Sequence, residues 1–114
     1  MMRHPQWWLP SPLRRYALAD IVHSVGDVPI NLPSRAAVVV LDGDRLKWIA
    51  FDCPCTRGHR ILVSLDEEVR PHWTVTRAQP LTLHPSIDAK TDGRQCHYLI
   101  RRGRIVWVPA RKKR

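Results

Sequence analysis

The sequence predicts a small, mostly β domain of the small α+β class, with antiparallel β-hairpins that form a small sheet, one N-terminal helix and a zinc-ribbon-like metal site. Two observations support this prediction. Short β-branched and aromatic segments alternate with turn residues about every eight to twelve positions, and the cysteines lie beside histidines in two clusters. The chain has 114 residues, enough for one domain with a modest core. We expect that domain to span residues 1–109, with a β core over about 36–108 and a basic tail over 110–114.

A helix is predicted near the N-terminus, over about residues 12–25. Ser11 suits an N-cap, and Pro12 suits the first helical position. Apolar residues then recur every four positions, as in the stripe of an amphipathic helix: Leu13, Ala17 and Ile21. Gly26 suits the C-terminal end. We expect this helix to pack on or beside the sheet.

The remainder of the chain is predicted to form short strands. Residues 36–41 and 45–51 are expected to form a hairpin, with Asp42-Gly43 supplying the turn. A second hairpin is expected over residues 96–109, with its turn at Arg102-Gly103. Three further strand candidates lie between the hairpins, at residues 60–65, 72–77 and 81–84.

The charge and hydropathy of the chain limit its partners. The net charge is +9 and the pI is near 10.5, which favours acidic partners such as nucleic acid. The charge is scattered, however, and its one dense run is the tail, so we expect only weak, non-specific binding of nucleic acid and a protein partner for specific function. There is no run of about 18 apolar residues and no secretory signal, so we expect no membrane span and a cytoplasmic protein.

The cysteine and histidine residues predict a metal site. An odd number of cysteines in a chain without a secretory signal argues against a disulfide framework. The first cluster holds Cys53, Cys55 and His59, and the second holds Cys96 and His97. Zinc binds cysteine sulfur and histidine nitrogen tetrahedrally, and two ligand pairs on separate hairpin ends would form a zinc-ribbon-like site. Neighbouring residues on a regular strand point to opposite faces, so either the chain turns at the second cluster or only one of its two residues binds metal.

The same residues allow three alternatives to the metal site. The cysteines can be small buried hydrophobic residues. The segment LHPSID holds His84, Ser86 and Asp88, but residues so close together cannot easily form a catalytic triad, and such a Pro-Ser element is more often a turn at a strand end. Cys55 or Cys96 could be a nucleophile with a histidine base, but this role conflicts with closed zinc coordination. The sequence therefore favours a binding module over an enzyme.

The blocks FDCPCTRGHRILVSL, PHWTV, LTLHPSI and GRQCHYLIRRGRIVWV resemble a bacterial and phage family catalogued as domain of unknown function 6527. In that family a Cys-Pro-Cys-x-x-Gly-His block precedes a strand, and a segment with Cys and His opens a closing hairpin. The resemblance covers roughly residues 45–108. Many members have further cysteines at the positions of Arg57 and Arg94 here. The resemblance therefore implies a reduced ligand set: Cys53, Cys55, Cys96 and either His59 or His97.

The resemblance also implies a biological setting. Some relatives are similar to proteins encoded beside bacterial ubiquitin-like conjugation genes, and others lie in phage genomes. We expect a small zinc-binding module with a binding or adaptor role, and the resemblance implies that it is accessory to a ubiquitin-like modification or phage-conflict system, with components of that pathway as partners. The alternatives are a metal- or Cys-dependent hydrolase acting on ubiquitin-like conjugates and a basic nucleic-acid-binding protein.

Overall fold

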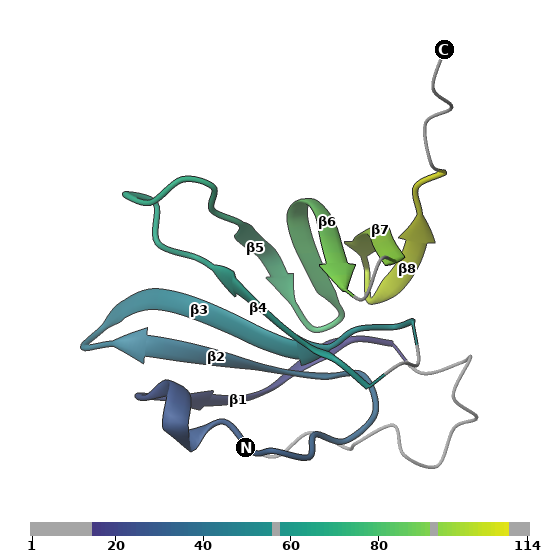
Figure 1. Cartoon of the computed structure of the whole chain (residues 1–114). Helices are drawn as coiled ribbons and strands as arrows, with labels where there is room; N and C mark the ends of the chain where they lie inside the picture. Colours follow the sequence, from purple (N-terminus) through teal and green to yellow (C-terminus); the bar gives the residue numbers. More distant parts are fainter. Residues whose placement is uncertain (1–14, 56–57, 92–93, 110–114) are drawn as a thin grey trace.

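The computed structural model describes residues 15–55, 58–91 and 94–109, which form two four-stranded β-sheets and one short 3₁₀ helix (Figure 1). The first sheet has the order β1-β2-β3-β4, with bounds Ala17–Val22, Ala36–Asp42, Arg45–Asp52 and Arg60–Ser64. The second has the order β5-β6-β7-β8, with bounds Thr74–Ala78, Leu81–Thr91, Arg94–Arg101 and Arg104–Trp107. In Figure 1, the second sheet lies above and to the right of the first. The prediction of a mostly β fold is confirmed.

Both predicted hairpins are present. Strands β2 and β3 pair antiparallel, and Asp42↔Arg45 is the pair next to the turn. Strands β7 and β8 pair in the same way, closed by Arg101↔Arg104. In both turns a glycine has a positive φ, 64° at Gly43 and 78° at Gly103. Glycine tolerates this left-handed conformation without the penalty that a Cβ brings, which is why the turn residues could be recognised from the sequence.

The predicted helix over residues 12–25 is wrong in the part that the structure describes. Residues Ala17–Val22 form strand β1, which pairs in parallel with β2, and only Val25–Asp27 form a 3₁₀ turn. The four-residue spacing of apolar residues fits a helix, but β2 would otherwise present an open edge of unpaired main-chain groups. Pairing with β2 satisfies those groups, and the β-branched Ile21 and Val22 suit a strand.

Parts of two predictions lie outside the described residues. These are the first residues of the predicted helix, 12–14, and the basic tail, 110–114. Within the described ranges, the structure contains no helix of the length and apolar character needed to cross a membrane.

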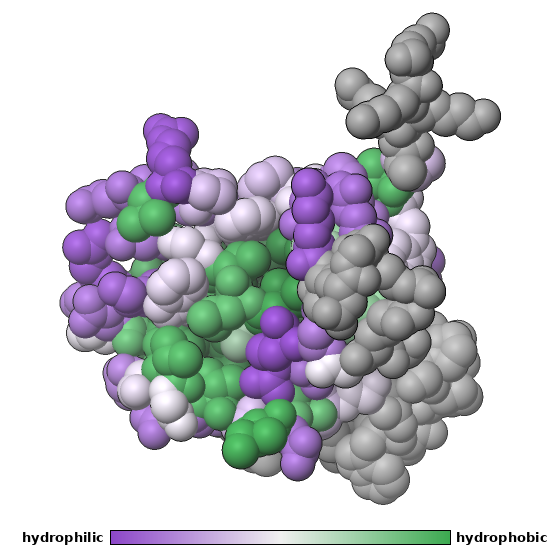
Figure 2. Space-filling view, in the orientation of Figure 1, coloured by the Kyte–Doolittle hydropathy of each residue, from purple (hydrophilic) through white to green (hydrophobic). Residues whose placement is uncertain are grey.

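The hydrophobic core lies between the two sheets. The first sheet contributes Ile49 and Phe51, and the second contributes Leu81, Leu83 and Tyr98, all of them at most 1% exposed. Figure 2 shows apolar side chains gathered in the middle of the molecule's face, with polar side chains around them. The core is therefore shared, so that residues from distant parts of the sequence meet where the sheets face one another.

A main-chain junction at Tyr16 ties the first sheet to two of the turns of the second, the β5–β6 turn and the β7–β8 turn. The Tyr16 N–H donates to the Gly103 carbonyl at 2.8 Å, and the Tyr16 carbonyl accepts from the Leu81 N–H at 2.9 Å. The Gly103 N–H in turn donates to the Leu81 carbonyl at 2.6 Å. A Cβ on Gly103 would lie 2.6 Å from the Arg15 Cβ and 2.9 Å from the Tyr16 oxygen, so only glycine fits there.

We expect Gly103→Ala to lower the free energy of unfolding far more than Gly43→Ala. Both glycines have a positive φ, so both substitutions cost about 1 kcal/mol of backbone strain. At Gly43 nothing lies within 4 Å of the added Cβ, whereas at Gly103 the Cβ collides with main chain, so the total loss should exceed about 3 kcal/mol. Urea unfolding of the two variants measures the difference. Equal losses would contradict the close approach at Gly103.

Candidate functional site

The loop between β3 and β4 is held closed at its base. The last register pair of the two strands is Asp52↔Arg60, and the Arg60 Nε also donates to the Asp52 Oδ1 at 2.7 Å. One residue further, the Cys53 N–H donates to the His59 carbonyl at 3.0 Å. Gly58 has a φ of 79°, which lets the chain reverse just before His59. The Cys-Pro-Cys segment and His59 are thereby brought face to face.

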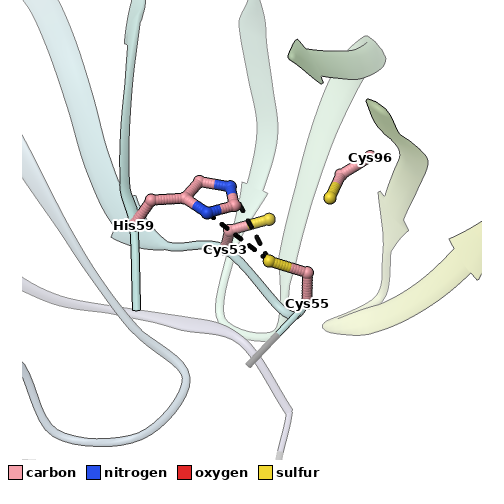
Figure 3. Close-up of side chains that lie close together, drawn as sticks. All are labelled: Cys53, Cys55, His59 and Cys96. Atoms are coloured by element: carbon pink, nitrogen blue, oxygen red, sulfur yellow. Dashed lines mark hydrogen bonds between the residues drawn. The ribbon is translucent and has the colours of Figure 1, made fainter. Parts of the chain in front are cut away.

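Four side chains that could hold a metal ion lie close together at this loop (Figure 3). Cys53, Cys55 and His59 come from the loop and Cys96 comes from β7, and their ligand atoms all lie within 4.8 Å of one another. The Cys55 Sγ lies 3.5 Å from the His59 Nδ1. Tetrahedral zinc with ordinary bond lengths places sulfur and nitrogen about 3.5 Å apart and two sulfurs about 3.8 Å apart. The geometry and the Cys₃His donor set therefore fit a metal ion, and zinc is the metal that such donors favour.

The sulfur of Cys53 lies in the hydrophobic core. The residue is 6% exposed, and burial raises the pKa of its thiol to about 12. The Tyr98 hydroxyl donates to the Cys53 Sγ at 3.7 Å, and burial, followed by this hydrogen bond, raises the pKa of Tyr98 above its ordinary value. The free Cys53 thiol is therefore protonated at neutral pH, and a bound cation would take the place of that proton. The Tyr98 hydroxyl would then act as an outer hydrogen-bond donor to a metal-bound sulfur.

His59 and His97 lie on different sides of the second sheet. His59 is part of the cysteine cluster, whereas His97 lies on the opposite face of β7 from its neighbour Cys96, because successive side chains of a strand alternate. The cluster thus takes three residues from one loop and one from a strand of the other sheet. This arrangement differs from the two pairs on hairpin ends that the sequence led us to expect.

His97 lies instead beside a serine. The Ser86 Oγ and the His97 Nε2 are 2.9 Å apart, within hydrogen-bonding distance. The contact depends on a shift in the β6–β7 register, which runs from Leu83↔Ile100 to Ile87↔Tyr98. The two extra residues on β6 make a bulge that places Ser86 diagonally opposite His97. Both side chains are half-buried, so each is partly open to solvent.

The main chain on each side of this pair is fixed by a further hydrogen bond. The Trp73 Nε1–H donates to the Ser86 carbonyl at 3.2 Å, and the Val108 N–H donates to the His97 carbonyl at 2.9 Å. In the tautomer of His97 with its hydrogen on Nδ1, the Nε2 accepts a hydrogen bond from the Ser86 hydroxyl. The pair therefore has the geometry of an alcohol nucleophile beside a general base.

Other residues of the LHPSID segment are not part of this pair. His84 is exposed, and Asp88 lies directly opposite His97 in the register but accepts a hydrogen bond from the Gln95 Nε2 at 2.7 Å. Across the described ranges, no carboxylate is hydrogen-bonded to His97. The prediction that the Pro-Ser element forms a turn is wrong, because Ser86 lies inside β6. The missed signal was a histidine on the facing strand, which only the register identifies.

One comparison with known proteins gave a match. A family model described as "Bacterial ubiquitination-like system serine protease (BubE)" matches residues 24–108 of the 114. The matched range contains the Cys₃His group of Cys53, Cys55, His59 and Cys96, and also the Ser86–His97 pair. No curated protein and no solved structure matches the chain.

Proposed function

Because this chain belongs to the BubE family of bacterial ubiquitination-like system serine proteases, we propose that it is a serine peptidase of such a system, with Ser86 as nucleophile and His97 as general base. The observation that carries the proposal is the 2.9 Å contact between the Ser86 Oγ and the His97 Nε2. A serine hydroxyl is a weak nucleophile by itself and becomes effective when an adjacent base removes its proton.

The proposed reaction is acyl transfer in two steps. The Ser86 Oγ attacks the carbonyl carbon of the scissile bond, and its proton passes to the His97 Nε2. The C–N bond then breaks, and the protonated His97 gives that proton to the leaving amine. Water, deprotonated by His97, next attacks the ester on Ser86, and the acid product leaves as the hydroxyl is restored. A component of the ubiquitin-like pathway is the proposed substrate.

The cluster of Cys53, Cys55, His59 and Cys96 is proposed to hold a structural zinc ion. Such an ion supplies cross-linking free energy to a small domain rather than a reaction step. In this chain it would link the β3–β4 loop to β7, the strand that carries His97 next to Cys96. The ion would therefore fix the position of His97, the proposed general base.

A thiol nucleophile is the second candidate. Cys55 and His59 lie 3.5 Å apart, which also suits a thiol beside a base. The sulfurs of Cys53 and Cys96 converge on the same point, however, and four converging soft donors favour metal binding. The serine in the family's description further supports Ser86, and a zinc-bound Cys55 could not serve as nucleophile.

A fluorophosphonate probe tests the assignment, since it forms a covalent bond with activated serines. We expect mass spectrometry to find one adduct, on Ser86, in the zinc-loaded protein. The exposed Ser24 provides a control: Ser24→Ala should be labelled as fast as the unmodified protein, and His97→Gln should not be labelled. No adduct on Ser86, together with activity that iodoacetamide abolishes, would support the thiol candidate instead.

A further inference from the structure

Strand β6 has an open edge that begins at the proposed nucleophile. The neighbouring strand β5 pairs with β6 only as far as Thr74↔His84. Beyond that point, the described residues of β6 have β7 on one side and no paired strand on the other. Residues 86–90 therefore form an edge about 17 Å long, at about 3.4 Å per residue.

One hydrogen bond and the strand register show which main-chain groups point to the open side. The His97 carbonyl accepts from Val108 and so points toward β8, away from β6. Asp88 is the register partner of His97. In an antiparallel pair, the main-chain groups of two opposite residues either hydrogen-bond to each other or both point away from each other. The N–H and C=O of Asp88 therefore point to the open side. The groups of Lys90 do the same, since directions repeat every second residue.

The contact of Trp73 with Ser86 agrees with this orientation. Trp73 directly precedes β5, and its indole N–H reaches the Ser86 carbonyl from that side. Ser86, Asp88 and Lys90 thus direct their main-chain groups the same way, and Trp73 occupies only the first of the three. Asp88 and Lys90 are exposed, and no described strand pairs with them on this side.

We propose that this edge binds the extended terminal segment of a ubiquitin-like protein as an additional β-strand. The inference rests on the proposed function and names the substrate surface of the same site. An added strand lies about 4.8 Å from β6, where its main chain can bond to Asp88 and Lys90. It then ends at Ser86, whose Oγ is hydrogen-bonded to His97.

The geometry selects an extended chain over a folded surface. Only a segment with unpaired N–H and C=O groups, such as an extended terminus, can bond to an edge, so segments already paired on both sides within a folded substrate are excluded. Recognition through the main chain also tolerates different side chains. The net charge of +9 favours an acidic segment among those that reach the edge.

Binding of N-methylated peptides tests this inference without changing the main chain of the edge. The protein is the full chain with Ser86→Ala, which lacks the proposed nucleophile and so cannot cleave the peptide. The probe is a fluorescent peptide with the terminal sequence of the ubiquitin-like protein of the same system. N-methyl groups placed one at a time remove one main-chain N–H each. Strand addition predicts weakening of at least about tenfold at alternate positions and little change between them, because directions repeat every second residue.

Substitutions at Lys90 provide a matched pair. Proline removes an N–H and is tolerated on a strand edge where that N–H faces solvent, so Lys90→Pro should fold and weaken peptide binding by about tenfold or more. Lys90→Ala keeps the main-chain groups, so its Kd for the peptide should stay within about twofold of the parent value, well below a tenfold change. Retention of zinc by both variants reports that the domain has folded.

The outcomes separate this inference from the proposed function. Fluorophosphonate labelling of Ser86 combined with uniform effects of N-methylation, or with full binding by Lys90→Pro, would overturn strand addition alone. An alternating pattern without labelling of Ser86 would support the edge and overturn the peptidase. Absence of saturable binding would overturn the inference, as would a dimer of this chain that Lys90→Pro abolishes, since a second copy would then occupy the edge.

Discussion

Ser86→Ala should lower kcat for peptide hydrolysis by about 10⁴-fold or more, the size of effect that follows loss of a serine nucleophile. The substitution removes the hydroxyl that contacts the His97 Nε2 and leaves the packing of β6 almost unchanged. We therefore expect the free energy of unfolding to stay within about 1 kcal/mol of the parent value. Steady-state kinetics and urea unfolding of the same preparation measure both quantities. Residual activity above a tenth of the parent would contradict the role of Ser86.

Two histidine variants separate the pairing seen in the structure from the pairing that chain proximity suggests. His97→Gln removes the proton acceptor and should lower kcat to a similar extent. His84→Gln alters the histidine two residues from Ser86, which is exposed and lies outside the pair, and should leave kcat within about twofold, as for an ordinary surface substitution. The opposite ranking would make His84 the base. Zinc content should be the same in both variants, because neither residue belongs to the metal cluster.

The second large effect concerns the metal cluster. We expect about one zinc ion per chain, and we expect Cys55→Ser to release it and to lower the free energy of unfolding by more than about 4 kcal/mol. A bound ion would join the β3–β4 loop to β7, so its loss would remove this link between the two sheets at this end of the core. Peptidase activity should fall together with zinc content, because Cys96 and His97 are neighbours on β7. Elemental analysis and thermal unfolding, with and without a chelator, measure these changes.

Loss of an imidazole gives the matched control for this prediction. His59→Ala removes a proposed ligand, whereas His23→Ala removes an exposed imidazole that lies between β1 and the 3₁₀ turn. Only the first should lose zinc and melt at lower temperature. Purified protein that contains no metal, with a melting temperature unaffected by chelation, would show that the three cysteines serve as buried hydrophobic residues instead.

The features that the sequence predicted well are those governed by local chemistry. Asp42-Gly43 and Arg102-Gly103 specify their turns because glycine adopts a positive φ with little strain, and the alternation of apolar residues beside them specifies strands. The Cys-Pro-Cys segment and His59 are close in the chain, so their proximity in space could be anticipated. Cys96 is a candidate by residue type alone, because cysteine is a metal ligand whatever the strand register.

The features that were missed depend on long-range pairing. Strand β1 has a helical spacing of apolar residues, and only the open edge of β2 makes it a strand. The Ser86–His97 contact depends on a bulge that shifts the β6–β7 register. Without that register, His84 is the histidine nearest to Ser86 in the chain, and a turn at a strand end is the favoured interpretation of the segment.

The arrangement of three cluster residues in one loop and one in a distant strand has a consequence for the order in which the chain folds. Cys53, Cys55 and His59 lie within seven positions, so a newly made chain could hold a metal ion with these three before its sheets exist. Cys96 follows His59 by 37 positions, and closing a loop of that length requires the two sheets to meet. The β6–β7 hairpin is marginal alone, so Ser86 and His97 become firmly aligned only at this last stage. The proposed peptidase would therefore be inactive during its own synthesis and would acquire activity on completion of the core.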